Sequence, residues 1–269
     1  MAGASNLRFV GLHHHVGFSG VGEGYRPDLD VMHHAECTRE LCEFALVVTE
    51  RLGVPIERLD LGGGFPSGRA VYLVTPGNVG DGALHPLPAT AAYADAITSV
   101  VREHFAEDAL PILQFETGRY QVANATLLLA RVTDVKDGHS APPRRFVTVD
   151  SSMQQFTSKG FTHTAFQVVP VTAPDADDNG LLADVVGQTC AYDSIAEDVV
   201  LPDLEVGDVL AFTNQSAYCD TTGTNLNAMP RPAVVLVEAG RAALAKRRET
   251  LMDIVGRYAG PALDWKELA

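Results

Sequence analysis

The feature that most constrains the fold is a change of pattern near residue 121 of the 269-residue chain. Before this point, short apolar runs alternate with amphipathic stretches of helical period, a pattern typical of β-α-β units and a parallel sheet. After it, short apolar runs follow one another with turn residues between them, which favours a mostly antiparallel β domain. The sequence therefore predicts an α/β part followed by an all-β part.

The α/β part contains three predicted strands and two predicted helices. The expected strands are residues 7–15, 57–61 and 111–115, the expected helices are 36–52 and 91–105, and residues 66–90, rich in proline and glycine, predict a long loop. Three βα units cannot close an eight-stranded barrel, and alone they would leave parallel strand edges and apolar helix faces in water. Either this small sheet is unusually well covered, or another chain completes it.

The β part is predicted from short strands separated by turn residues. The expected strands are 126–135, 145–149, 165–171, 185–187, 209–213 and 233–237. Apolar positions between Leu244 and Tyr258 predict a last amphipathic helix. These patterns divide the chain into a partial barrel at 1–120, a C-terminal β domain at 121–243, and a helix with a tail at 244–269.

Composition narrows the classes of function. Lys and Arg number 20 against 34 Asp and Glu, so the formal net charge of −14 argues against binding to nucleic acid or to anionic membranes. No apolar run approaches the roughly 20 residues of a membrane span, and the first residues lack the pattern of a signal peptide. The four cysteines follow neither disulfide nor metal-ligand spacing, so we expect a reduced, cytoplasmic protein.

A run of three glycines, Gly62, Gly63 and Gly64, follows the second predicted strand. Because glycine has no Cβ atom, such a run lets main-chain N–H groups approach an anion closely. At the carboxyl end of a parallel strand, that arrangement forms a phosphate cradle. The alternative interpretation is a tight turn between the strand and the following loop.

Polar residues also follow the first and third predicted strands. His13 and His15 share one face of the first strand, where they could bind zinc with Glu116 as a further ligand. Alternatively, one histidine packs in the core and the other stacks on a ligand. Glu116 and Arg119 could serve a pyridinium nitrogen and a phosphate or carboxylate, or they could form a structural ion pair.

The β part adds two candidates, Cys190 and Tyr218, each of which follows an apolar strand. A buried cysteine is usually inert, whereas a tyrosine at such a position could present its phenol to a phosphate. Each of these residues is ordinary when it is considered alone.

The order of the motifs is more specific than any one of them. The chain carries His-x-His-x-Gly, Asp-x-Gly-Gly-Gly-Phe, Glu-x-Gly-Arg-Tyr, Gly-x-x-Cys, Asn-x-Asn and Arg-Arg-Glu-Thr, in that order. From about Leu7 to about Tyr258, it resembles the fold-type III pyridoxal-phosphate decarboxylases, a family that includes diaminopimelate and ornithine decarboxylases. So many motifs in one order make coincidence very improbable.

The resemblance implies a fold, a cofactor and residue roles. It implies that a partial (β/α)8 barrel, comprising the last three βα units, precedes the mostly antiparallel β domain. It assigns the stacking on the cofactor ring to His15 and the pyridine nitrogen to Glu116, and it gives Cys190 the protonation of the product carbanion in the opposite subunit of the family dimer. The residues implied to bind pyridoxal phosphate are His15, Gly62, Gly63, Gly64, Glu116, Gly118, Arg119 and Tyr218.

The same resemblance identifies a missing group, the Schiff-base lysine on the first barrel strand. Since this chain starts at what corresponds to the sixth strand, we expect a C-terminal subunit of a split decarboxylase. A partner chain would supply the N-terminal barrel half and the lysine, in a dimer of heterodimers or a homodimer. The alternatives are a non-catalytic regulator paired with a true decarboxylase, a metal-dependent hydrolase using His13 and His15, and a fragment. None of the four lysines suits the role: Lys136, Lys159, Lys246 and Lys266.

Overall fold

The computed structural model describes residues 4–16, 27–65, 88–139, 143–156, 166–172, 181–190, 193–256 and 258. The chain divides into two compact units, each of which is described by itself. The first unit comprises residues 1–129, 158–174 and 210–217, and the second comprises 130–157, 175–209 and 218–269. Within the described part of the chain, none of the helices combines the length and the apolar character needed to cross a membrane.

A parallel sheet of three short strands organises the first unit. Its strands, in spatial order, are β1 (Gly11–His13), β2 (Arg58–Asp60) and β3 (Ile112–Gln114). Leu12 lies opposite Leu59, and Leu59 lies opposite Leu113, so three leucines share one face of the sheet. Because side chains alternate along a strand, the residues on either side of each leucine point to the other face.

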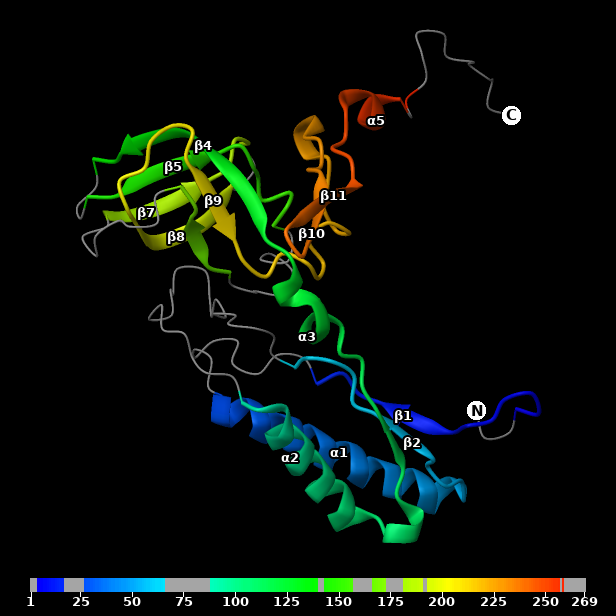
Figure 1. Cartoon of the computed structure of the whole chain (residues 1–269). Coiled ribbons are helices and arrows are strands. Elements are labelled where there is room, and N and C mark those ends of the chain that lie inside the picture. Colours follow the sequence, from blue (N-terminus) through cyan, green and yellow to red (C-terminus); the bar gives the residue numbers. More distant parts are fainter. Residues whose placement is uncertain are drawn as a thin grey trace, which may run out of the picture. The chain divides into compact units, whose positions relative to one another are not determined.

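Two helices pack on the leucine face and connect the strands, as parallel pairing requires. They are α1 (Pro27–Leu52) and α2 (Thr90–His104), which Figure 1 shows side by side. Helix α1 is followed by Gly53, whose φ of +66° is left-handed and ends the helix. The core of this unit is formed by Leu41, Cys42, Ala45, Ile56, Leu59, Leu61, Tyr93, Ile97, Val100 and Val101.

Short elements complete the first unit. They are the 3-10 turns η1 (Glu107–Ala109) and η2 (Ala123–Ala125), helix α3 (Gly118–Val122), and the antiparallel pair β6 (Val168–Pro170) and β9 (Val209–Phe212). The ring of Phe212 is fully buried, and its centroid lies 5.7 Å from that of Phe166.

The second unit contains four strands of a mixed six-stranded sheet, whose full order is β6-β9-β4-β5-β7-β8. They are β4 (Leu128–Asp137), β5 (Arg145–Val149), β7 (Leu181–Val186) and β8 (Ser194–Leu201). The β4–β5 and β7–β8 pairs are antiparallel, whereas β5 and β7 are parallel. The guanidinium of Arg144 bonds to the carboxylates of Asp184 and Asp198, which ties the start of β5 to β7 and β8.

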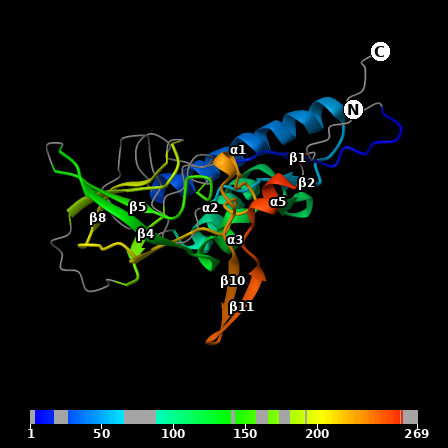
Figure 2. The same cartoon turned by 90° about the horizontal axis from the view of Figure 1, so that it is seen from above.

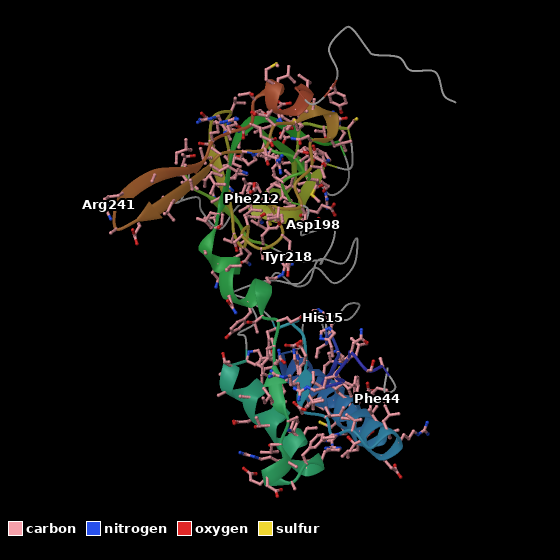
Figure 3. All side chains as sticks on the ribbon, turned by 90° about the vertical axis from the view of Figure 1, so that its right-hand side faces the viewer. His15, Phe44, Asp198, Phe212, Tyr218 and Arg241 are labelled. Carbon is pink, nitrogen blue, oxygen red and sulfur yellow. The ribbon has the colours of Figure 1, made fainter. Side chains whose placement is uncertain are left out.

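The second unit ends in a hairpin and a short helix. They are β10 (Val234–Glu238), β11 (Arg241–Lys246) and α5 (Leu251–Val255), and the 3-10 turn η3 (Leu226–Ala228) precedes them. The hairpin turns through Ala239 and Gly240, both with positive φ, as two-residue hairpin loops prefer. Figure 2 shows it as a two-stranded ribbon, and Figure 3 labels Arg241 at its turn.

The predicted pattern of elements is largely confirmed, with differences in both units. Helix α1 begins at Pro27 instead of residue 36, and strands β8 and β11 were not predicted. The prediction that the last helix begins at Leu244 is wrong, because Leu244 lies in β11 and α5 begins at Leu251. The predicted loop falls mostly in residues 66–87, which lie outside the described residues.

Candidate functional site

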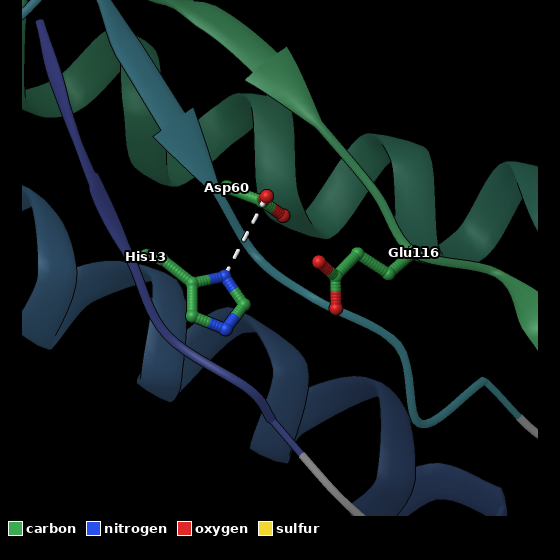
Figure 4. A group of neighbouring side chains, drawn as sticks. All are labelled: His13, Asp60 and Glu116. Atoms are coloured by element: carbon green, nitrogen blue, oxygen red, sulfur yellow. Dashed lines mark ion pairs between the residues drawn. The ribbon is translucent and has the colours of Figure 1, made fainter.

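Three adjacent strands bring polar side chains to the carboxyl edge of the parallel sheet. His13 ends β1, Asp60 ends β2, and Glu116 follows β3. Nδ1 of His13 lies 3.5 Å from Oδ2 of Asp60, and one ligand atom from each of the three residues lies within 4.8 Å of the others (Figure 4). This edge therefore offers one imidazole and two carboxylates to a cation or to a protonated ring nitrogen.

The glycine run packs tightly between the ends of β1 and β3. The N–H of Gly62, at φ +65°, donates to Oδ1 of Asp60 at 2.9 Å, and the N–H of Gly63 donates to Nδ1 of His15 at 3.3 Å. A Cβ on Gly62 would lie 2.8 Å from that same His15 nitrogen, and one on Gly63 would lie 2.6 Å from the main-chain oxygen of Glu116. Close packing thus requires glycine at both positions. Their N–H groups already have acceptors within the chain, so the phosphate role of the run stays a prediction.

Arg119 lies in α3, directly after the third strand end. The N–H of Gly118 donates to the main-chain oxygen of Glu116 at 2.8 Å, so the chain turns into α3 without an intervening loop. The side chain of Arg119 is buried. A buried guanidinium provides the charge and the fork of donors that a phosphate or a carboxylate needs.

His34 was not singled out from the sequence, although it lies against the aromatic residue that follows the glycine run. Its ring centroid is 4.7 Å from that of Phe65 and 5.0 Å from that of Tyr93. Nδ1 lies 3.0 Å from the main-chain oxygen of Asp30. Burial lowers the pKa of His34, because desolvation disfavours the imidazolium form more than Asp30 favours it.

In the second unit, Cys190 is exposed on a loop that Asp193 closes. The buried carboxylate of Asp193 accepts the N–H of Thr189 at 2.7 Å through Oδ2 and the N–H of Met153 through Oδ1. Its main-chain oxygen accepts the N–H of Gly187 at 2.7 Å. A Cβ on Gly187 would lie 2.5 Å from the Asp193 carboxyl group, so glycine is required there.

Tyr218 also belongs to the second unit. Its φ is +64°, and the residue is 47% exposed. Tyr218 is labelled in Figure 3. A left-handed conformation costs a non-glycine residue on the order of 1–3 kcal/mol, and such conformations gather at functional sites. The predicted site residues therefore fall into two groups: those at the strand ends of the first unit, and Cys190 with Tyr218 in the second.

Neither of the lysines in the described residues suits the role of the predicted cofactor-binding lysine. Lys136 lies in β4, 2.6 Å from Asp134, and Lys246 lies in β11, paired with Asp220. The expectation that Lys246 belongs to the last helix is wrong, because that residue is part of the hairpin. Lys159 and Lys266 lie outside the described residues, and residues 1–129 contain no lysine.

Comparison with known proteins gives consistent matches. The family model for the pyridoxal-dependent decarboxylase C-terminal sheet domain matches residues 28–216. The diaminopimelate decarboxylase of Methanothermobacter thermautotrophicus is 31% identical over 256 residues, which cover 94% of this chain and 54% of the relative. The enzyme of the same name from Actinosynnema pretiosum is 33% identical over 264 residues, which cover 94% of this chain and 52% of the relative.

The solved structures agree with these sequence matches. The crystal structure of diaminopimelate decarboxylase from M. jannaschii has a TM-score of 0.73 at 26% identity, and the match covers 94% of this chain and 52% of that one. The chain thus spans about half the length of the relatives that it matches.

Proposed function

Because this chain belongs to the pyridoxal-dependent decarboxylase family, we propose that it is the C-terminal part of an amino-acid decarboxylase and that a partner chain supplies the N-terminal barrel half. The open sheet carries this proposal. Within the described residues, β1 and β3 each pair only with β2, so both outer edges offer unpaired main-chain groups. Further βα units on these edges would complete a (β/α)8 barrel, in which this chain provides the last three.

The absence of lysine from residues 1–129 supports the same proposal. A pyridoxal enzyme holds its cofactor through a lysine amine. In the family that lysine lies on the first barrel strand, which the partner chain would provide. The domain limits that we propose are a partial barrel at 1–120, a β domain at 121–243, and a C-terminal helix with its tail at 244–269.

The residues at the strand ends fit pyridoxal phosphate, the cofactor of this family. The exposed carboxylate of Glu116 can accept a hydrogen bond from the protonated ring nitrogen, and the ring of His15, fixed by the N–H of Gly63, can stack on the cofactor. Arg119 and Tyr218 have the charge and the hydroxyl that a phosphate needs. When bound, this cofactor supplies the electron sink that the loss of a carboxylate requires.

Cys190 is the proposed proton donor. Its S–H bond breaks, the proton moves to the carbon that has lost the carboxylate, and the electron pair stays on Sγ. The exposed side chain and the closed loop present the thiol at a defined place. The proposal includes a dimer in which Cys190 acts in the site of the opposite subunit. All four cysteines are free, which is consistent with a proposed cytoplasmic location.

Co-expression with a candidate partner chain tests this function. Purified complex should release carbon dioxide from an amino acid, and Cys190→Ser should lower that rate by about 10²–10⁴-fold, the usual contribution of a positioned proton donor. A rate that Cys190→Ser leaves unchanged would favour the alternative of a non-catalytic regulator. A chain that is well behaved, monomeric and partnerless would contradict the split enzyme.

One observation favours a second candidate, a metal-dependent hydrolase. His13, Asp60 and Glu116 have the ligand types and the proximity that a metal site needs, although His15 is not among the three. Metal analysis of purified protein separates the two functions. If the protein contained stoichiometric zinc and Glu116→Gln lost it, the hydrolase would be supported. Glu116 would then be a metal ligand and not a ligand of the cofactor ring.

A further inference from the structure

Two loops of the second unit meet at the sulfur of Cys190. Nδ2 of Asn227 lies 3.9 Å from Sγ of Cys190, and Nε2 of Gln188 lies 3.8 Å from Sδ of Met229. One loop is the stretch that Asp193 closes, and the other contains the turn η3. Cys190 is thus contacted by a side-chain amide that comes from 37 residues away in the sequence.

The backbone at Asn227 is strained. Asn227 has φ 56° and ψ 26°, and Ala228 has φ 58°. Left-handed backbone is unfavourable for alanine and better tolerated by asparagine, so two such residues in succession persist only where surrounding groups hold them. Here the N–H of Ala228 donates to the main-chain oxygen of Asn225 at 3.0 Å, and Nδ2 of Asn225 donates to the main-chain oxygen of Met229 at 2.9 Å.

Glu249 anchors this turn. Its Oε2 accepts Nδ2 of Asn225 at 2.7 Å and the main-chain N–H of Arg231 at 2.8 Å, while its Oε1 accepts Nε of Arg231 at 2.7 Å. These hydrogen bonds from Arg231 lower the pKa of Glu249 to about 2, so the carboxylate is ionised at neutral pH. The turn is therefore held by a charged group, and within the described residues it is Asn227, not Glu249, whose side chain reaches Cys190.

We propose that Asn227 is a positioning residue for Cys190, whose amide donates a hydrogen bond to the sulfur and stabilises the thiolate that remains after proton release. This inference deepens the proposed function, because it rests on Cys190 as the proton donor. A thiol whose thiolate is stabilised gives up its proton more readily. The contact also limits the rotamers that the Cys190 side chain can adopt.

Alkylation of Cys190 in the full chain tests the contact without any need for activity. Iodoacetamide reacts with the thiolate, and Cys190 is the exposed cysteine while Cys37, Cys42 and Cys219 are buried. The test variant is Asn227→Gly, which removes the amide but keeps the left-handed backbone. The matched control is Ala228→Gly, which has nearly the same φ and loses only a methyl group.

Mass spectrometry of the Cys190 peptide at pH 7 gives the rate. Asn227→Gly removes the hydrogen bond that the amide donates to Sγ, so Cys190 should react about threefold more slowly. Ala228→Gly should react at the rate of the natural chain. An unchanged rate in Asn227→Gly, or an equal drop in both variants, would overturn the proposal.

If Asn227→Gly failed to fold, the three buried cysteines would also be alkylated. A second variant keeps the proposal testable in that case. Asn227→Asp keeps the size and tolerates the backbone, but it places a carboxylate beside the sulfur and should slow alkylation by threefold or more. Alkylation of Asn227→Asp at the natural rate would also overturn the proposal. If Cys190→Ser left the decarboxylation rate unchanged, Cys190 would not be the proton donor and the proposed function would fail. The alkylation rates would still report whether Asn227 contacts the sulfur.

Discussion

The N–H of Gly63 donates a hydrogen bond of 3.3 Å to Nδ1 of His15, so the glycine run fixes the histidine at the end of β1. Gly62 takes part in the same contact, because its Cα approaches His15 so closely that a Cβ would lie 2.8 Å from Nδ1. The residue expected to stack on the cofactor and the residues expected to hold its phosphate are thus coupled through direct packing.

We expect Gly62→Ala to cost more stability than Gly53→Ala. The two glycines have φ of +65° and +66°, so alanine meets the same backbone strain, about 1–2 kcal/mol, at both. Only Gly62 is crowded, whereas a Cβ on Gly53 meets nothing within 4 Å. Overpacking should add about 1–3 kcal/mol at Gly62 in urea unfolding. Equal losses would show that His15 moves freely.

Asp193→Asn should destabilise the second unit. Both carboxylate oxygens accept a main-chain N–H, and an amide nitrogen cannot accept the second one. A buried donor left without an acceptor costs about 1–3 kcal/mol. Asp150→Asn is the control, since exposed Asp150 accepts one N–H, from Arg131. If chemical denaturation gives the same loss for both variants, the closed loop at Cys190 is not held by Asp193.

The pKa of Glu249 predicts acid-sensitive stability. This pKa falls from the ordinary 4.5 to about 2 in the folded chain. Because the folded state binds the proton less readily, the stabilisation is complete above about pH 4.5 and is lost as the pH falls toward 2. Glu249→Gln should reduce the free energy of unfolding at pH 7 by about 1–3 kcal/mol and flatten its slope in this window. A slope that matches the natural chain would contradict the anchoring role.

The lowered pKa of His34 predicts a second range of pH in which the stability of the fold changes. Burial lowers its folded-state pKa below the ordinary 6.5, so its contribution to stability is intact above pH 6.5 and is lost as the pH falls through the folded value. His34→Phe keeps an aromatic ring against Phe65 and should remove this dependence in thermal unfolding scans. The control His104→Phe, at a less buried position, should leave the pH dependence of stability unchanged. The opposite pattern would mean that His34 is solvated.

The sequence predicts the strand ends of the first unit well, because three apolar runs followed by polar residues can only meet at one edge of a parallel sheet. The second unit is less predictable. β8 contains Glu197 and Asp198, which interrupt the apolar pattern, and Asp198 has a φ of 54° and bonds to the distant Arg144. β11 has exposed residues from Arg241 to Ala245, including Leu244, so its pattern resembles a helix face.

Nothing in the sequence near Asn227 or Cys190 indicates that these two residues are in contact. It depends on the left-handed backbone at Asn227, and that depends on Glu249, which lies beyond the hairpin. Long-range hydrogen bonds of this kind follow from the folded chain and not from residue spacing. The family motifs marked Cys190 and the Asn-x-Asn segment, but they did not indicate that the two meet.

Borohydride reduction of the assembled enzyme, followed by peptide mapping of the lysine that carries the cofactor, tests the central claim most directly. We predict that this chain alone retains no pyridoxal phosphate after reduction, and that the complex carries it on a lysine of the partner chain. Stoichiometric modification of Lys136, Lys159, Lys246 or Lys266 in this chain alone would contradict the split-enzyme account.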